Sequence, residues 1–596
     1  MKASLRRWLI APSENWSDPR VVLWYSLSLL FAIYYGYLAL QNAFSGPYVM
    51  QDDARQHVFW MLRFVEPGAF PNDFMADYYQ SNAPVGYVWL YRSAAAVGIN
   101  PYVFSKVLPP ILGFVGTHYC FRLSLQVMPL APAAFTSTLI LNQSLWMRDD
   151  LMSGTPRAFL YALLLAFLVY VNQRAIIPCL IVLIAQSLIY PLCGLLSAAI
   201  LGLRLIEFKA ERLRLTQNSR DYWLSGLGLA LLVIFLAPYA LASSPYGPVI
   251  TPATARSMPE FWPGGRSAYF TDNPIKFWFG DRSGIIPTPV LTPPTMAFSL
   301  LFPWFWWRSN SAWLSTIRGR AAILQQLVIA SFILFFAAHL TLYKLYLPSR
   351  YTHHSLRILF ALAASFVIWI LFDYLLQIIE DSTASRRQWL RRGIASLTVG
   401  FIALNLLGYS ETLNNFPGLF NSSRHGVTPD LYEFFHQTPP NTTIASLTKE
   451  TSNLHVFTRR SPLISPELGL PYHTGYYQQF RQRVGALIEA QFNPDLSAVQ
   501  DFIRTYEIDY WLLDDKSFSL AFWLQNKWFN QHRPEAQTAI ARLDNQDISP
   551  ALIKGIDICT VLTTTPQRRG SDKVSERDAQ QFWLLDANCL LQLPAD

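Results

Sequence analysis

The sequence predicts an α-helical polytopic membrane protein with about eleven transmembrane helices and a C-terminal α/β domain outside the cytoplasm. Hydrophobic residues occupy 52% of the 596 positions and charged residues only 14%, whereas soluble chains carry about 25% charged residues. The apolar residues gather in runs with few charges at 21–40, 321–342 and 356–379. Each run is long enough to cross a hydrocarbon layer of about 30 Å as a helix.

Basic residues predict the orientation, because loops rich in Lys and Arg stay in the cytoplasm. They cluster at 204–220, 308–320 and 386–392, and Arg6 and Arg7 precede the first apolar run. The N-terminus is then cytoplasmic, the first span is an uncleaved anchor and the C-terminus lies outside. Because successive loops must lie on alternate sides of the membrane, we expect single crossings at 21–43, 103–125, 131–147, 156–171, 222–242, 291–307, 322–343, 356–376 and 394–409. Two further crossings form a hairpin that turns at Tyr190-Pro191.

A second trace gives the same number of crossings. It makes residues 85–99 a span and residues 175–206 one long helix, and it moves residues 147–155 to the cytoplasmic side. We favour the first trace because residues 85–99 are few, include Arg92 and follow an amphipathic stretch, as expected of a helix that lies on the membrane surface.

The favoured trace divides the chain into a membrane module, residues 1–410, and a soluble extracytoplasmic domain, residues 411–596. In the soluble domain we expect strands at 444–447 and 510–513, a helix at 496–506 and a closing strand pair within 582–593. The domain carries no Walker, GxGxxG, HExxH or GxSxG motif, which favours a binding or supporting role. Cys559 and Cys589 can pair there if the compartment is oxidising. Four segments of the membrane module face the same side, at 44–102, 148–155, 243–290 and 346–355.

The first outer segment contains Gln51-Asp52-Asp53-Ala54-Arg55-Gln56-His57. Two adjacent carboxylates at a membrane surface can act as a general base or hold a divalent cation. Alternatively, Asp53 and Gln56 form a capping box that starts a surface helix. We favour chemistry, because a cap would leave Asp52 without a role.

Other polar residues of this segment are weaker candidates. His57 follows Asp53 by one helical turn and can orient its carboxylate, or it is simply solvated. Asp73 and Asp77 are also one turn apart. We expect them to frame the same pocket, although surface helices often carry such pairs.

The second and fourth outer segments add an acidic pair and a basic cluster. Asp149 and Asp150 either reach the site of the first pair or belong to a solvated loop. Arg350, His354 and Arg357 follow one helical face and break the charge rule for outer loops. Guanidinium groups bind phosphate oxygens bidentately, so we favour a phosphate or pyrophosphate ligand over contacts with lipid headgroups.

The order of these elements resembles the GT-C superfamily, which includes protein O-mannosyltransferases, the lipid A aminoarabinose transferase and oligosaccharyltransferases. The likeness extends over most of residues 1–410. It implies a glycosyltransferase that takes a sugar from a polyprenyl phosphate or pyrophosphate carrier and transfers it to a glycan, lipid or protein outside the cytoplasm, at a bacterial inner or plasma membrane. It assigns catalysis to Asp52 or Asp53 and to Asp149 or Asp150, and the contact with the carrier phosphate to Arg350, helped by Arg357. We count Tyr351, His354 and His57 as further candidates for donor binding.

The chain departs from two of these subfamilies. It has Asp-Asp where O-mannosyltransferases have Asp-Glu, and it lacks the WWD motif of oligosaccharyltransferases. Metal dependence therefore stays open, with Mg²⁺ or Mn²⁺ at Asp52 and Asp53 as the expectation. The alternative functions are a non-catalytic assembly factor for an envelope polysaccharide and, less favoured because the charges lie at the outer surface rather than mid-span, a transporter.

Overall fold

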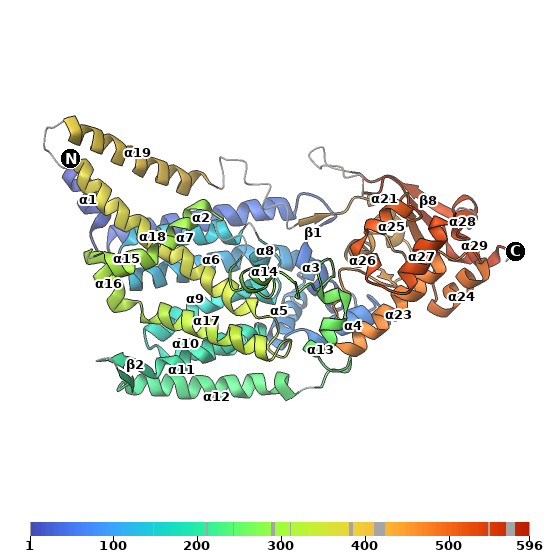
Figure 1. Cartoon of the computed structure of the whole chain (residues 1–596), viewed down its shortest axis with the longest axis horizontal. Coiled ribbons are helices and arrows are strands. Elements are labelled where there is room, and N and C mark those ends of the chain that lie inside the picture. The colour runs from blue at the N-terminus through green and yellow to red at the C-terminus, as the bar shows by residue number, and fades with distance from the viewer. Residues whose placement is uncertain are drawn as a thin grey trace.

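A computed structural model describes residues 2–146, 148–209, 212–241, 243–287, 292–309, 311–380, 386–409, 423–545, 549–567 and 578–594. Long helices run side by side along the long axis of the molecule, and a unit containing a β-sheet covers one end of this bundle (Figure 1). The N-terminus lies at the opposite end of the molecule from the C-terminus (Figure 1).

Apolar helices make up the bundle, and five of them are long and apolar enough to cross a membrane: α2, α12, α17, α18 and α19. These helices identify the chain as an integral membrane protein, while the total of eleven crossings stays a prediction. The bundle helices are α1 (Lys2–Ile10), α2 (Pro19–Ala43), α5 (Val85–Ala96), α6 (Pro101–Val127), α7 (Ala131–Leu145), α9 (Phe159–Asn172), α10 (Ile176–Ile189), α11 (Pro191–Arg204), α12 (Ser219–Leu241), α15 (Phe302–Arg308), α16 (Ala312–Arg320), α17 (Ala322–Leu340), α18 (Ser349–Glu380) and α19 (Arg386–Gly408).

The predicted hairpin at Tyr190-Pro191 is confirmed. Arg174, before α10, and Arg204, at the end of α11, both place their Nε atoms 2.9 Å from the carboxylate of Asp221 in α12. The two helices therefore begin and end at the same side of the bundle, which one long helix could not do. A two-stranded sheet of β2 (Ile206–Lys209) and β3 (Arg212–Leu215) follows at that end (Figure 1).

The second trace is excluded by the contacts of residues 148–155. The hydroxyl of Tyr91 donates to the carbonyl of Gly154 at 2.9 Å. Arg157, two residues after this loop, pairs with Asp53 of the first outer segment. This loop is thus at the same end of the bundle as residues 44–102. Helix α5 has 12 residues and rises about 18 Å, too short to cross the hydrocarbon layer alone.

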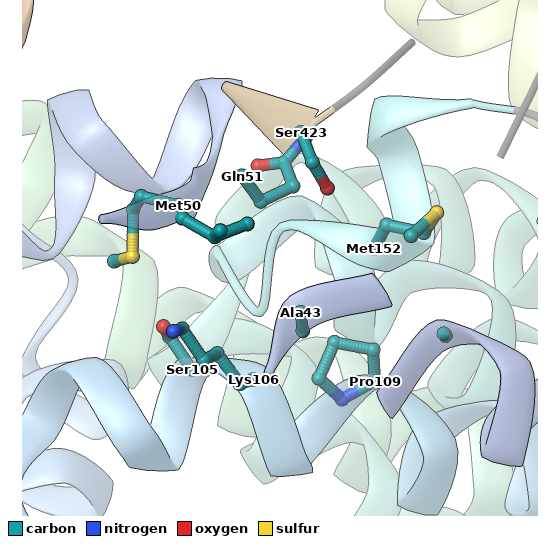
Figure 2. Close-up of a pocket in the computed structure, with 10 residues that line it drawn as sticks. Ala43, Met50, Gln51, Ser105, Lys106, Pro109, Met152 and Ser423 are labelled. Carbon is teal, nitrogen blue, oxygen red and sulfur yellow. The ribbon is translucent and has the colours of Figure 1, made fainter. Parts of the chain in front are cut away.

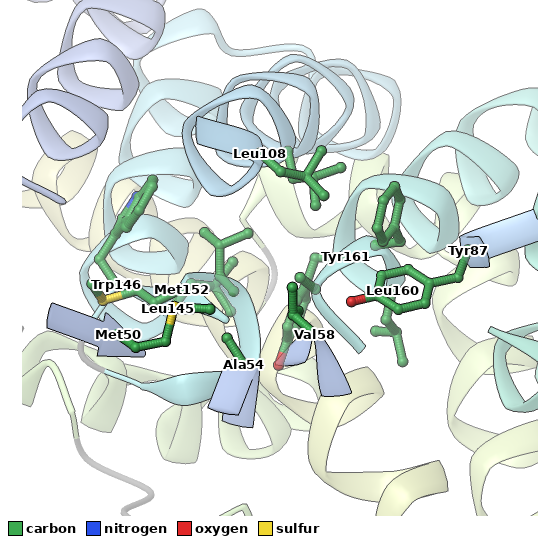
Figure 3. Close-up of a cluster of buried hydrophobic side chains, with 14 of the residues drawn as sticks. Met50, Ala54, Val58, Tyr87, Leu108, Leu145, Trp146, Met152, Leu160 and Tyr161 are labelled. Carbon is green, nitrogen blue, oxygen red and sulfur yellow. The ribbon is translucent and has the colours of Figure 1, made fainter. Parts of the chain in front are cut away.

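The outer segments carry short elements of their own. They are β1 (Val49–Gln51), α3 (Asp52–His57), η1 (Phe59–Phe64), α4 (Phe74–Asn82), α8 (Asp149–Met152), η2 (Pro156–Ala158), α13 (Pro252–Ser257), η3 (Pro259–Phe261) and α14 (Pro274–Phe279). Met50, Ala54 and Val58 from the first segment share one buried cluster with Met152 from the second segment and with Trp146 at the end of α7 (Figure 3). This apolar contact fixes the two acidic segments against each other.

Two predicted elements differ from the structure. Residues 291–307 do not form one α-helix: a 3₁₀ helix, η4 (Pro294–Leu301), precedes the short α15 and packs along α18. Prolines at 293, 294 and 303 remove the backbone donors that a continuous helix needs. The outer segment 346–355 is mostly helical, because α18 already begins at Ser349 and continues for 32 residues.

The C-terminal part contains a five-stranded sheet in the order β6-β5-β7-β9-β8. Strands β6, β5 and β7 are parallel, and β9 is antiparallel to β7 and β8. The strands are β5 (Thr443–Ala445), β6 (Ser461–Pro462), β7 (Tyr510–Asp514), β8 (Thr560–Thr564) and β9 (Phe582–Asp586). The helices are α21 (Pro429–His436), α22 (Thr451–Thr458), α23 (Thr474–Gln491), α24 (Leu496–Tyr506), α25 (Leu520–Gln525), α26 (Lys527–Asn530), α27 (Glu535–Asp544), α28 (Leu552–Cys559) and α29 (Ala587–Gln592).

Most sequence predictions for this part hold. The strands near 444 and 510 and the helix at 496–506 are confirmed, but the strand pair within 582–593 is wrong. Asp586 ends β9 and caps α29 by accepting from the backbone N–H of Asn588 at 2.7 Å, so the chain turns into a helix. A disulfide joins Cys559 to Cys589, with their Cα atoms 5.5 Å apart. The predicted domain boundary at 410–411 lies outside the described residues.

The C-terminal part is tied to the first outer segment. Strand β4 (Ser423–His425) pairs antiparallel with β1, immediately before the acidic pair. In a second contact, Asp73 caps α4 and its buried carboxylate lies 2.8 Å from Nε2 of His455. The position of α3 therefore depends on the C-terminal part as well as on the bundle.

Replacing Asp221 with Ala should lower the free energy of unfolding by about 3 kcal/mol or more, because two arginines would lose their buried partner. Thermal unfolding of the purified protein in detergent measures the change. The control is Glu14→Gln, which removes a half-exposed carboxylate that pairs with Arg320 at the same end and should change stability by less than about 1 kcal/mol. Equal effects of the two substitutions would contradict the buried cluster.

Candidate functional site

The acidic pair lies on α3, and neither of its members caps this helix. The side chain of Gln51 is the N-cap and accepts from the backbone N–H of Ala54 at 3.1 Å. Gln56 instead donates to the hydroxyl of Tyr79 at 2.8 Å. The capping-box interpretation of Asp53 and Gln56 is therefore wrong, and both aspartates are available for contacts outside the helix.

Asp52 is held by two arginines. Its carboxylate accepts from Arg55 on the same helix and from Nη2 of Arg424 in β4 at 2.7 Å. Burial alone would raise the pKa of Asp52, but the two guanidinium groups outweigh it and lower the pKa to about 2. Asp52 thus remains ionised and joins α3 to the strand that leads into the C-terminal part.

Asp53 contacts the second acidic segment instead of the C-terminal part. Nη2 of Arg157, in η2, pairs with Oδ2 of Asp53, and Nε of the same arginine lies 3.0 Å from Oδ1 of Asp150. One guanidinium therefore bridges carboxylates from two outer segments. The side chain of Asp53 is 28% exposed and that of Asp150 is 13% exposed, so Asp53 is the more accessible acid.

Helix α18 brings a guanidinium and an imidazole to Asp150. Nη1 of Arg357 donates to Oδ2 of Asp150 at 2.7 Å, and Nδ1 of His354 lies 3.7 Å from the same oxygen. The hydroxyl of Tyr161 in α9 contacts Arg357 and lies 3.0 Å from Nδ1 of His354. Burial opposes ionisation of Asp150, but Arg157 and the other cations outweigh it and hold the pKa of Asp150 well below its usual range.

Arg350 occupies the first turn of α18 near this cluster. Its backbone N–H donates to the carbonyl of Leu347 at 3.1 Å. Its side chain is partly buried and makes no hydrogen bond or ion pair with any other residue that the structure describes. Its charge reaches the site: burial and the charges of Arg157 and Arg350 lower the pKa of His57 to about 4, against the opposite influence of Asp53. His57 is therefore neutral at physiological pH, and Arg350 has a guanidinium available for a ligand.

The third outer segment adds another cation. Nη1 of Arg282 donates to the hydroxyl of Tyr472 at 3.2 Å, and Asp53 is among the charges that raise the pKa of Arg282. Four arginines, at 157, 282, 350 and 357, thus surround two described carboxylates, those of Asp53 and Asp150. The described part of the cluster carries an excess of positive charge.

Other predicted site residues do not join this cluster. Tyr351 is buried and its hydroxyl donates to the carbonyl of Leu345 at 3.0 Å. Asp73 pairs with His455, and Asp77 pairs with Arg63 at 2.7 Å. The expectation that these two aspartates frame the same pocket is wrong. Asp149 begins α8, and its side chain lies outside the described residues.

Sequence reasoning missed Arg157, Arg282 and Tyr161. Arg157 had a usable signal, because an arginine on an outer loop next to a span violates the charge rule as clearly as Arg350 and Arg357 do. Tyr161 gave none, since a tyrosine inside an apolar helix is ordinary.

A small cavity lies beside the site, between the outer ends of α2 and α6 and strand β1 (Figure 2). Its volume of about 20 Å³ admits roughly one water molecule. Met50, Gln51, Ser105, Lys106 and Met152 are among its lining residues. The cavity is too small for a sugar or a phosphate in this conformation.

A chain of hydrogen bonds leads from Arg55, the partner of Asp52, to a buried glutamate, Glu450. Nη1 of Arg55 donates to Oδ1 of Asn453 at 2.6 Å, and Nδ2 of Asn453 donates to Glu450 at 3.1 Å. Tyr432 also donates its hydroxyl to Glu450. Burial raises the pKa of Glu450 from 4.5 to about 7, although both hydrogen bonds oppose the rise.

No protein-family model and no curated protein match this sequence. Several solved structures, however, are similar to this chain. The apo oligosaccharyltransferase of Archaeoglobus fulgidus has a TM-score of 0.53 and 13% identity, over 88% of this chain and 73% of that one. The archaeal oligosaccharyltransferase AglB from Archaeoglobus fulgidus, in complex with an inhibitory peptide and a dolichol-phosphate, has a TM-score of 0.52 and 12% identity, over 86% and 72%. The arabinofuranosyltransferase AftD from Mycobacteria has a TM-score of 0.49 and 12% identity, over 97% and 42%. The fold of this chain is thus similar to that of the archaeal oligosaccharyltransferase, as the sequence resemblance predicts.

Glu450 should make stability depend on pH. Because its pKa is raised to about 7 from an ordinary 4.5, the folded protein holds this proton more tightly than the unfolded chain, and stability falls as pH rises between these values. Glu450→Gln cannot ionise, so it should gain stability relative to wild type between pH 5 and pH 8, by roughly 3 kcal/mol. Thermal unfolding across this range measures the difference, with Glu489→Gln, at a half-exposed carboxylate, as the control. A difference that is constant with pH would contradict the raised pKa.

Proposed function

We propose that this chain is a membrane glycosyltransferase that moves a sugar from a polyprenyl phosphate or pyrophosphate carrier to a glycan, lipid or protein acceptor outside the cytoplasm. The observation that carries the proposal is that the carboxylate of Asp53 and the guanidinium of Arg350, whose side chain has no partner among the described residues, lie at the same end of the bundle, where both act on His57. The fold supports it, because the similar archaeal protein is an oligosaccharyltransferase that was solved with a dolichol-phosphate.

A phosphate suits the charge of the site. The side chain of Arg350 has no partner among the described residues, and the four arginines around Asp53 and Asp150 leave positive charge unbalanced. Guanidinium groups form bidentate hydrogen bonds with phosphate oxygens. Arg350 also lies in the first turn of a 32-residue apolar helix, close to the level at which a polyprenyl chain in the membrane presents its phosphate.

The residues support a direct displacement. Asp53 accepts the proton of the acceptor hydroxyl as its oxygen forms a bond to the sugar carbon, and the bond from that carbon to the carrier phosphate breaks. Arg350, with Arg357 and Arg282 near it, stabilises the negative charge that develops on the departing phosphate. Inversion at the sugar carbon follows from attack opposite the leaving group. Asp150 anchors Arg157 and Arg357 and is too strongly paired to act as a base.

Two observations support an orientation with the site outside the cytoplasm. The basic clusters predicted to be cytoplasmic lie at the opposite end from the acidic pair, where Arg174 and Arg204 meet Asp221. The disulfide between Cys559 and Cys589 needs an oxidising compartment around the C-terminal part. A bacterial inner or plasma membrane fits both requirements.

Asp53→Asn should reduce sugar transfer by about 10²-fold or more, because a general base would be lost. Arg350→Ala should reduce it by about 10²-fold, because the leaving phosphate would lose a hydrogen-bond donor. Transfer of label from a radiolabelled polyprenyl-phosphate sugar pool in membranes with matched protein levels measures both effects.

Two nearby substitutions serve as controls for this assay. Asp77→Asn changes a carboxylate of the same outer segment, and Lys344→Ala removes an exposed cation six residues before Arg350. Both controls should retain transfer. Undiminished transfer in Asp53→Asn and Arg350→Ala would contradict the assigned site, and no protein-dependent transfer from any pool would favour a non-catalytic assembly factor.

The orientation predicts unequal labelling from outside the membrane. A cysteine introduced as Asp501→Cys, on an exposed side chain of the C-terminal part, should react with a membrane-impermeant maleimide in spheroplasts. Glu14→Cys, at the other end of the molecule, should react only after the membrane is permeabilised. The reverse pattern would contradict the proposed topology.

A further inference from the structure

We infer that Arg157 takes the place of a divalent cation between the two acidic segments, so that this site works without a metal ion. Arg157 becomes a positioning residue, which holds the carboxylate of Asp53 in place by bridging it to Asp150. The inference deepens the proposed function and rests on it for the identity of the base. Its geometric part concerns only Arg157 and the two carboxylates.

The bridge joins separate parts of the chain. Arg157 lies in η2, directly after Pro156 at the first position of that 3₁₀ helix. Its Nη2 pairs with Oδ2 of Asp53, 104 positions earlier in the sequence, and its Nε lies 3.0 Å from Oδ1 of Asp150. The arginine side chain is only 16% exposed. Water therefore screens this contact poorly, and the guanidinium is held in place.

The donor set does not fit a divalent cation. Mg²⁺ prefers about six oxygen ligands at about 2.1 Å, and Mn²⁺ also prefers oxygen ligands. No group of three or more Asp, Glu, His or Cys side chains is arranged to hold a metal ion within the described ranges. The two carboxylates that meet here already share a guanidinium between them, and the other described carboxylate of the pair, Asp52, points to Arg55 and Arg424.

The other positive charges near Asp53 and Asp150 also disfavour a divalent cation. Arg357 lies 2.7 Å from Asp150, and Arg350 influences the ionisation of both Asp150 and His57. A divalent cation next to Asp53 would be repelled by these three arginines. A fixed guanidinium meets the same need, since it joins the two acidic segments through Asp53 and Asp150, and it cannot be removed by a chelator.

The decisive experiment measures Mn²⁺ binding directly, by electron paramagnetic resonance of purified protein in detergent. Wild type should bind no stoichiometric Mn²⁺. Arg157→Met keeps the length of the side chain and removes its charge, so it should gain a Mn²⁺ site that is lost again when Asp53→Asn is added. Arg63→Met, which removes another partly buried arginine that pairs with Asp77, is the matched control and should gain no site. Stoichiometric Mn²⁺ binding by wild type that depends on Asp53 would overturn the inference.

Transfer activity supplies an independent readout. Wild-type transfer should be unchanged by EDTA, Arg157→Met should lose at least about tenfold, and Arg157→Lys, which retains a cation and guards against a folding defect, should recover part of the loss. Loss of wild-type transfer in EDTA with recovery on adding Mg²⁺ or Mn²⁺ would overturn the inference and leave the proposed function standing. Absence of transfer from every donor pool would overturn the proposed function alone, because Mn²⁺ binding still judges the role of Arg157.

Discussion

The contact of Arg157 with Asp53 and Asp150 holds the outer end of this membrane protein together. Three segments that are distant in the sequence converge there: α3 after α2, α8 and η2 after α7, and the first turns of α18. Each brings a charge to the edge of the hydrocarbon layer, where an unpaired ion is costly. Arg157 satisfies two of these charges at once, and the cations left over create the site that we assign to a phosphate.

The C-terminal part causes the adjacent residues Asp52 and Asp53 to have different roles. Strand β4 pairs with β1 and brings Arg424 to Asp52, while Asp53, one residue later, faces the bundle. Asp52 therefore supports the position of α3, and Asp53 keeps an accessible carboxylate. This division explains why an Asp-Asp pair need not act as a pair. It also connects the C-terminal part to the chemistry, and Tyr472 of that part accepts a hydrogen bond from Arg282.

The sequence predicted the helices well, because hydropathy and charge report directly on burial in lipid and on orientation. It also identified the Tyr190-Pro191 hairpin and the basic face of α18, and brought Asp150 to the same surface as the first acidic pair. It could not choose between Asp52 and Asp53, because that choice depends on Arg424, 372 positions away. It also misjudged residues 291–307, where three prolines interrupt an apolar run, and residues 582–593, where Asp586 caps a helix.

The most direct test of the account is a cryo-electron microscopy map of the purified protein with polyprenyl phosphate. The account predicts the phosphate within hydrogen-bond distance of Arg350, with Arg357 nearby and the carboxylate of Asp53 facing the space where the sugar would lie. A phosphate bound elsewhere on the molecule, with Arg350 and Asp53 facing away from it, would contradict the account.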